Sequence, residues 1–302
     1  MNKILVTGGS GLIGQYLQKI LPDAFYISSK DYDLTKERDV IKLFKNNNFK
    51  TVVHLAARVG GIHHNILEPV KYFEENILMN TLILKYSYIY KVKNFLTLLS
   101  SCIYPDDIKS YPIKEKYLFE GAPHKSLFSY SYAKRSMAVQ IDAYNSKYGT
   151  NYNYLIPCNL YGEFDKFEAV QGHFVGALIE KIIKAKKNKD NYIKLFGDGT
   201  PRRQFMHARD LALIIKAFLK KNFKEPINIA TSENYTIKKI ADIALDACEF
   251  KNAKIIFDKK MPNGQMRKDI NISKFKKIFP KFKPIKLYDG IKEIYLKKIK
   301  EL

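Results

Sequence analysis

The sequence has no tryptophan and little cysteine. Its 302 residues include three cysteines, Cys102, Cys158 and Cys248, at unrelated spacings. An odd number of cysteines without paired spacing fits neither a disulfide framework nor a metal site built from thiol pairs. We therefore expect the protein to work in a reducing compartment, the cytoplasm, and to hold no metal.

Long apolar runs are also missing. No apolar segment reaches the roughly 18 residues that a membrane-spanning helix needs. The chain enters a strand pattern directly after Met1, without the charged, apolar and small-residue segments of a signal peptide. The lack of tryptophan and of clustered arginine argues against a base-stacking surface for nucleic acid. We expect neither a membrane nor a nucleic acid as a partner.

Acidic residues are scarce relative to basic ones. The 52 Lys and Arg residues against 30 Asp and Glu give a formal net charge of +22. Much of the excess is lysine in polar stretches such as 181–189 and 274–283, which we interpret as solvated surface. The same charge would steer an anionic substrate or cofactor toward the protein.

Up to about residue 160, short apolar runs alternate with helical patterns. Such alternation predicts an α/β fold of the Rossmann type, a doubly wound parallel sheet covered by helices on both faces. The near-continuous apolar strands agree, because central parallel strands are buried on both sides. The predicted strands are 3–7, 24–27, 51–55, 94–99 and 152–157, and the predicted helices are 13–21, 38–46, 70–90 and 130–148.

Beyond residue 160 the alternation loosens. We expect residues 1–160 to form an NADP-binding Rossmann domain, completed by a return strand near 227–230. Residues 161–302 are expected to form mainly a smaller C-terminal α/β substrate lobe. Its predicted elements are helices 173–187, 210–220 and 236–248 and strand 192–196.

The segment Thr7-Gly8-Gly9-Ser10-Gly11-Leu12-Ile13-Gly14 lies between the first predicted strand and the first predicted helix. A glycine-spaced turn there lets the backbone approach a pyrophosphate, which the amides and the positive end of the helix then bind. Gly14 would let the helix lie close to the sheet. The predicted cofactor contacts are Gly8, Gly11, Leu12, Ile13 and Gly14, with Ala56 and Ala57 after the third strand, Lys30 after the second, and Lys134.

The end of the second predicted strand bears on the choice between NADP and NAD. It reads Ile27-Ser28-Ser29-Lys30-Asp31. A cation there would bind the 2′-phosphate of NADP, whereas an acidic residue would accept hydrogen bonds from the ribose hydroxyls of NAD. We predict NADP(H), held by Lys30, and Asp31 keeps NAD as an alternative.

Tyr130 and Lys134 are four residues apart in a helical pattern, so their side chains share one face. A phenol has a pKa of roughly 10, and a nearby ammonium is expected to lower the pKa of Tyr130. Tyr130 would then protonate the alkoxide that forms when hydride reaches a carbonyl carbon. Ser100, at the end of the fourth predicted strand, is placed to donate a hydrogen bond to the same oxygen.

These motifs resemble the extended short-chain dehydrogenase/reductase family, which has the spacing Gly-x-x-Gly-x-x-Gly. Longer strings resemble the GDP-L-fucose synthases, NADPH-dependent epimerase-reductases that act on GDP-4-keto-6-deoxymannose. The strings are Val59-Gly60-Gly61-Ile62, Ser100-Ser101-Cys102-Ile103-Tyr104-Pro105, Tyr130-Ser131-Tyr132-Ala133-Lys134, Asn159-Leu160-Tyr161-Gly162, Gly199-Thr200-Pro201-Arg202-Arg203-Gln204-Phe205 and Asn263-Gly264-Gln265.

The resemblance implies roles for further residues. Cys102 and His173 would be the base and acid that invert the carbons next to the ketone, whose protons the carbonyl acidifies. The two long helices 70–90 and 130–148 would pair two chains into a homodimer. A GDP-linked 4-keto sugar would be bound by Asn159, His173, Lys181, Phe196, Arg203 and Lys268, the cations at the diphosphate and sugar and Phe196 at the guanine.

The chain also departs from the synthase pattern. The synthases usually read Gly-Pro-His-Asp-Asn-Phe where this chain has Gly162-Glu163-Phe164-Asp165-Lys166-Phe167, and Gly176 replaces a proline. We interpret these changes as a different sugar, for example a 6-deoxy heptose in place of a hexose, or as weakened epimerisation. A C4 reductase without epimerase activity, an NAD-dependent nucleotide-sugar epimerase or dehydratase, and a non-catalytic dinucleotide-sensing regulator remain open alternatives.

Overall fold

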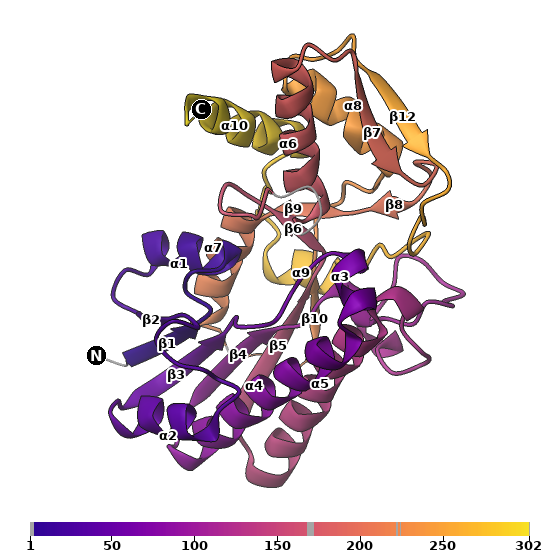
Figure 1. The fold of residues 1–302 in the computed structure, drawn as a ribbon. Coiled ribbons are helices and arrows are strands. Elements are labelled where there is room, and N and C mark those ends of the chain that lie inside the picture. The colour runs from indigo at the N-terminus through magenta and orange to yellow at the C-terminus, as the bar shows by residue number, and fades with distance from the viewer. Residues whose placement is uncertain (1–2, 168–171, 222, 224, 302) are drawn as a thin grey trace.

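A computed structural model of the protein describes residues 3–167, 172–221, 223 and 225–301. Its centre is a six-stranded sheet of order β10-β5-β4-β3-β1-β2 in which all neighbouring strands are parallel (Figure 1). The predicted fold class is confirmed. The strands are β1 (Lys3–Thr7), β2 (Phe25–Ile27), β3 (Phe49–His54), β4 (Asn94–Leu98), β5 (Asn151–Pro157) and β10 (Ile227–Ile229).

The strand order creates a switch point at the end of β1. From β1 the chain passes to β2 on one side and then returns to β3 on the other side. Thr7 is level with Ile27 of β2 and with His54 of β3, so the three carboxyl ends meet at one edge. Parallel α/β sheets bind their ligands in the crevice outside such a point.

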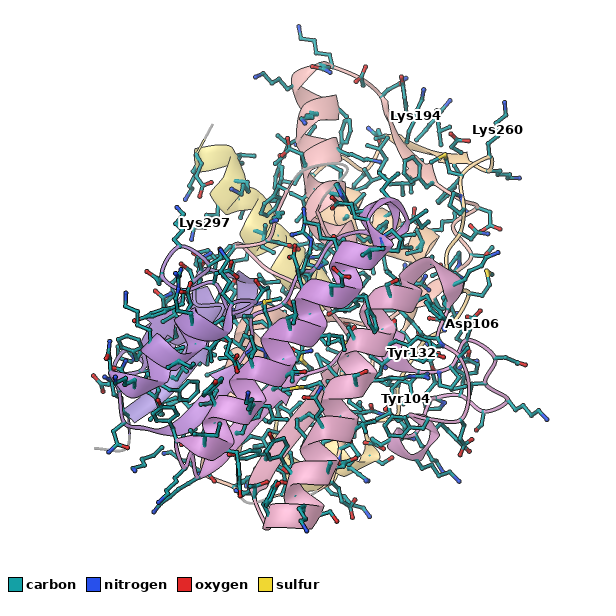
Figure 2. All side chains as sticks on the ribbon, turned by 60° about the horizontal axis from the view of Figure 1, so that its bottom comes forward. Tyr104, Asp106, Tyr132, Lys194, Lys260 and Lys297 are labelled. Atoms are coloured by element: carbon teal, nitrogen blue, oxygen red, sulfur yellow. The ribbon has the colours of Figure 1, made fainter. Side chains whose placement is uncertain are left out.

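Helices cover both faces of this sheet. On one face α1 (Leu12–Ile20) packs against α7 (Ala208–Phe218), and on the other α2 (Glu37–Lys45) and α5 (Phe128–Tyr148) flank α4 (Pro69–Ile89). Figure 2 shows α4 and α5 lying side by side along the molecule. In the described parts of the chain, none of the helices combines the length and the apolarity that crossing a membrane requires.

A second hydrophobic core lies beyond the carboxyl ends of the strands (Figure 1). Its buried side chains, such as Ile182, Ile193, Ile240 and Ile291, come from three helices and a parallel strand pair. These elements are α6 (Phe174–Lys187), α8 (Ile237–Ala247), α10 (Leu287–Lys300), β7 (Tyr192–Phe196) and β12 (Lys254–Asp258). The helix α7 and strand β10 return the chain to the first core.

Short elements complete the structure. Several of them were not predicted, because two- or three-residue strands carry no periodicity that a sequence pattern can reveal. They are α3 (Ile62–Leu67), α9 (Ser273–Ile278), β6 (Asn159–Tyr161), β8 (Arg202–Arg203), β9 (Phe205–His207), β11 (Tyr235–Thr236) and the 3-10 helices η1 (Ser101–Ile103), η2 (Glu115–Tyr117) and η3 (Lys125–Leu127).

Ion pairs join the two cores. Glu163 pairs with Lys19 of α1 at 2.8 Å and with Lys297 of α10, which Figure 2 labels. Arg209 of α7 and Glu293 of α10 form a second link at 3.1 Å. Because α1 and α7 belong to the first core and α10 to the second, these pairs fix one core against the other.

We expect Gly14→Ala to destabilise the protein. A Cβ at this position would lie 2.4 Å from the carbonyl oxygen of Gly8 and 2.5 Å from that of Gly9. Both contacts are with backbone, which cannot rotate away, so the free energy of unfolding should fall by about 1–3 kcal/mol. Urea unfolding measures the change, with the exposed neighbour Ser10→Ala as control. A Gly14→Ala protein as stable as this control would contradict the packing.

Candidate active site

The turn after β1 packs against the end of β3. Gly8 has a φ of 71°, and a Cβ on it would lie 2.8 Å from the amide nitrogen of Ala56. Thr7 Oγ1 accepts hydrogen bonds from the amides of Leu55 and Ala56, each at 3.1 Å. The structure therefore brings the glycine turn and Ala56 together at the switch point, with Ala57 next along the chain.

The helix that follows this turn begins without a side-chain cap. Gly11 is the N-cap residue of α1 and has extended backbone, and Leu12, Ile13 and Gly14 form the first turn of the helix. The amides of a first helical turn have no partner within the helix. Such amides, with the positive end of the helix dipole, suit a pyrophosphate.

At the end of β2, Asp31 is tied to its own turn. Its Oδ2 accepts hydrogen bonds from the amide of Ser28 at 2.7 Å and from the hydroxyl of Ser28 at 2.8 Å. These two bonds hold the pKa of the Asp31 carboxyl below its usual value, and the bond from the Ser28 amide has the larger effect. Lys30 is exposed beside it. The turn thus presents an exposed cation, while its carboxylate already accepts hydrogen bonds.

Tyr130 and Lys134 of α5 lie at the carboxyl end of β4. The Lys134 side chain is buried, and its Nζ donates a hydrogen bond to the carbonyl oxygen of Leu98 at 3.0 Å. The same Nζ lies 6.0 Å from the centre of the Tyr130 ring. Ser100 comes two residues after β4, as the N-cap of η1. The structure therefore brings the three predicted hydride-transfer residues to one end of the sheet.

Burial dominates the protonation of this pair. It lowers the pKa of Lys134 to about 8 and raises the pKa of Tyr130 well above its usual value. The expectation that Lys134 lowers the pKa of Tyr130 is not met, because the ammonium is directed at the Leu98 carbonyl and desolvation of the phenol outweighs it. The phenol is consequently held in its protonated form, the form that a proton donor needs.

Cys102 lies close to these residues. Its backbone carbonyl accepts a hydrogen bond from the Ser131 hydroxyl at 3.0 Å, which fixes η1 against α5. The buried thiol is near enough that a negative charge on it would raise the pKa values of Tyr130, Lys134 and Lys268. Cys102 therefore lies between the α5 pair and a lysine from the C-terminal part of the chain.

His173 reaches the same place from α6, as its N-cap residue. Its Nδ1 is hydrogen-bonded to Asp165 Oδ1 at 2.7 Å. Burial lowers the pKa of His173, but the hydrogen bond and charge of Asp165 outweigh burial and the nearby charges of Lys166 and Lys268, so its pKa is raised overall. Asp165 was not predicted as a site residue, and its only signal was its place in the 162–167 string.

Arg203 of β8 and Lys268 form a pair of adjacent cations. Burial lowers the pKa of Arg203 to about 10, and burial with the charge of Arg203 lowers the pKa of Lys268 to about 8. Among the residues that the structure describes, neither takes part in an ion pair with a carboxylate. Two close cations without a counter-charge fit an anionic group such as a diphosphate.

Lys181 and Phe196 form a separate group. Lys181 Nζ lies 5.3 Å from the centre of the Phe196 ring and donates a hydrogen bond to the carbonyl of Lys194 at 2.8 Å. Phe196 is 60% exposed. Asn159 of β6 instead donates to the carbonyl of Gln204 at 2.9 Å. No contact in the described residues joins Lys181 or Phe196 to Tyr130.

Comparisons with known proteins agree with this geometry. The sequence model of the "NAD dependent epimerase/dehydratase family" matches residues 4–230. The chain is 34% identical to the probable GDP-L-fucose synthase of Drosophila melanogaster, over 93% of this chain and 92% of that protein. It is also 34% identical to the GDP-L-fucose synthase of Dictyostelium discoideum, over 96% and 93% of the two chains.

Solved structures give the same result. A GDP-L-fucose synthetase from Naegleria fowleri superposes with a TM-score of 0.90 at 32% identity, covering 99% of this chain and 94% of that chain. A GDP-6-OMe-4-keto-L-xylo-heptose reductase from C. jejuni superposes with a TM-score of 0.89 at 25% identity, covering 100% and 98%. With its glycine turn, strand order and Tyr130–Lys134 pair, the chain belongs to the NAD dependent epimerase/dehydratase family, the extended short-chain dehydrogenases/reductases.

Proposed function

We propose that this protein reduces C4 of a GDP-linked 4-keto-6-deoxy sugar with NADPH and epimerises C3 and C5 of the same sugar. The proposal depends on one observation, the approach of Cys102 both to the Tyr130–Lys134 pair and to Lys268 from the C-terminal part of the chain. Tyr130 and Lys134 belong to the first core, and Lys268 comes from the C-terminal part of the chain. His173, at the start of α6, lies near the same Lys268.

In the reduction, NADPH when bound supplies the hydride. Tyr130, whose phenol burial keeps protonated, donates its proton to the C4 oxygen as charge develops there. Ser100 donates a hydrogen bond to the same oxygen. The phenolate that remains carries the negative charge, and the Nζ of Lys134 lies 6.0 Å from the centre of its ring.

In the epimerisation, Cys102 and His173 exchange protons with the carbons next to the ketone. The thiolate of Cys102 removes a proton that the carbonyl acidifies, with the side chains of Lys134 and Lys268 close by. His173 returns a proton to the opposite face, and Asp165, which outweighs burial and raises the pKa of the imidazole, favours the charged form that this step uses. No net oxidation takes place, because each proton removed is replaced by another.

The cofactor assignment to NADP(H) is supported by the turn after β2. Asp31 already accepts two hydrogen bonds from Ser28, whereas Lys30 is exposed and can bind a 2′-phosphate. The relative from Naegleria fowleri has been solved with NADP bound. We assign the pyrophosphate to the turn from Gly8 to Gly14, with Ala56 and Ala57 beside it.

The substrate assignment is supported by the cations. Arg203 and Lys268 would hold the diphosphate and the sugar, and Lys181 with the exposed Phe196 would lie at the guanine. Relatives named for GDP-linked hexoses and heptoses leave two sugar classes. Lys166, beside His173, is one of the departures from the usual synthase string and favours a sugar other than GDP-4-keto-6-deoxymannose.

We also propose a homodimer in the cytoplasm, with residues 1–160 and 227–230 as the NADP-binding domain and 161–302 mainly as the substrate lobe. Support for the dimer comes from α4 and α5, which lie side by side and carry exposed large apolar side chains. These side chains are Val70, Phe73, Leu78, Tyr88 and Ile89 of α4 and Phe128, Val139 and Tyr148 of α5.

The function is tested with purified protein, NADPH and a panel of GDP-4-keto-6-deoxy hexoses and heptoses in deuterated water. We expect oxidation of NADPH with one sugar of the panel, and NMR should find deuterium at C3 and C5 of its product. Reduction without deuterium would indicate a C4 reductase that lacks epimerase activity. Conversion without net NADPH consumption would instead support an NAD-dependent epimerase or dehydratase.

We expect Tyr130→Phe to lose turnover but keep its cofactor. Without the hydroxyl the alkoxide has no proton donor, so kcat should fall on the order of 10²–10⁴-fold. NADPH oxidation gives kcat, and quenching of NADPH fluorescence gives the dissociation constant, which should not change. A variant that keeps more than about a tenth of the wild-type rate would contradict the role of this phenol.

Lys30→Glu should move the cofactor preference from NADPH toward NADH. The new carboxylate repels the 2′-phosphate and can accept hydrogen bonds from a free ribose diol. The measurement is the ratio of kcat/KM for the two cofactors. Lys36→Glu, which makes the same charge change on an exposed residue outside the turn, is the control, and equal ratios in the two variants would refute the assignment.

A further inference from the structure

We propose that Asp165 is a positioning residue for His173, fixing the orientation and tautomer of its ring so that Nε2 faces the substrate. This inference deepens the proposed function and rests on it, because it concerns the acid of the epimerisation. The pair is joined by the 2.7 Å contact between His173 Nδ1 and Asp165 Oδ1.

The two partners differ sharply in exposure. The Asp165 side chain is 2% exposed, whereas that of His173 is 45% exposed. The Nδ1 edge of the ring is therefore turned toward a buried carboxylate. Nε2 is the ring nitrogen that Asp165 does not bind, and the exposure of the side chain leaves part of the ring accessible to a substrate.

The carboxylate sets the tautomer of the ring. An ionised carboxylate accepts hydrogen bonds only, so Nδ1 must carry a proton in both charge states of His173. Proton exchange is then confined to Nε2, which is an acceptor in the neutral ring and a donor in the charged ring. A ring without this partner could place its proton on either nitrogen, and part of the population would be unable to act at Nε2.

Asp165 itself is held firmly. Its Oδ1 also accepts a hydrogen bond from the amide of Lys166 at 2.9 Å, while the buried Oδ2 has no hydrogen-bond partner among the described residues. The Oδ2 atom lies 3.5 Å from where a Cβ on Gly176 would be, so α6 closes this side of the carboxylate. The contact with His173 and the Lys166 amide together compensate for the burial of this carboxylate.

Neighbouring charges would otherwise favour neutral His173. Lys166 and Lys268 face the ring and oppose its protonation, and burial acts in the same direction. Among the described residues, Asp165 raises the affinity of the ring for a proton, through its hydrogen bond and its charge. The imidazolium is the acid, so activity that needs it is lost as pH rises through the pKa of His173, and removal of the Asp165 charge moves this loss to lower pH.

The first measurement is the pH titration of His173 in the full-length protein, monitored by NMR of the ring protons. The His173→Gln variant identifies which signals belong to this residue. In Asp165→Asn we expect the titration to move to lower pH, and in Asp165→Glu to return toward that of the wild type. Asp242→Asn, an exposed acid on α8, is the matched control and should not move it. An unchanged titration in Asp165→Asn would overturn the proposal.

The second measurement compares two rates on the sugar that the panel identifies. In Asp165→Asn, deuterium incorporation at the carbon that His173 protonates should fall on the order of 10²–10⁴-fold, with its upper pH limb moved to lower pH. NADPH affinity and the thermal midpoint should remain near wild type. Incorporation within about threefold of wild type would refute the role. If no sugar reacts, the proposed function fails, while the titration still decides the pairing.

Discussion

The buried ammonium of Lys134 constrains the whole first half of the site. A charge away from water is costly unless it is hydrogen-bonded, and here it is bound to the carbonyl of Leu98 at the end of β4. That bond sets the distance between α5 and the sheet, and with it the place of Tyr130 relative to Ser100. Burial and, to a lesser extent, the charge of Lys134 lower the pKa of His54 to about 3, so this histidine stays neutral.

Neutral His54 in turn connects the elements around the switch point. Thr7 Oγ1 already accepts two amides, so its hydroxyl donates to His54 Nδ1 at 2.8 Å, which leaves Nε2 as the donor to Asn80 Oδ1 at 3.1 Å. Asn80 reaches the carbonyl of Ala133 on α5. This buried chain of hydrogen bonds runs from β1 through β3 and α4 to α5. The glycine turn and the Tyr130 pair are therefore positioned by one network.

Local patterns predicted the first core and much of the second, since the predicted helices 173–187 and 236–248 and the predicted strand 192–196 match α6, α8 and β7. Strand 3–7 was predicted to the residue, and Tyr130 and Lys134 were paired because four residues on a helix suffice to bring them together. Helix α10 was missed because its lysines look like solvated surface and Gly290 interrupts its pattern. That glycine is needed by a partner far away in sequence, since a Cβ on it would lie 2.3 Å from the Tyr161 hydroxyl.

The same distinction separates the site residues that could be predicted from those that could not. Glycine spacing and strand ends indicated the dinucleotide turn, whereas the bond from Lys134 to Leu98, 36 residues away, depends on the folded sheet. The predicted effect of Lys134 on the pKa of Tyr130 was wrong for this reason. Asp165 carried no signal of its own, because only the folded loop brings its carboxylate to Nδ1 of His173.

Two residues that differ from the synthase pattern, Glu163 and Gly176, lie on either side of the same loop in the folded protein. Glu163, which replaces a proline, anchors the loop to α1 and α10 through two lysines. Two residues further on, Asp165 meets His173 in the space that Gly176 leaves beside it. A loop fixed at one end by ion pairs can hold a buried carboxylate without the rigidity of proline. Glu163 and Gly176 are therefore both compatible with the contact between Asp165 and His173.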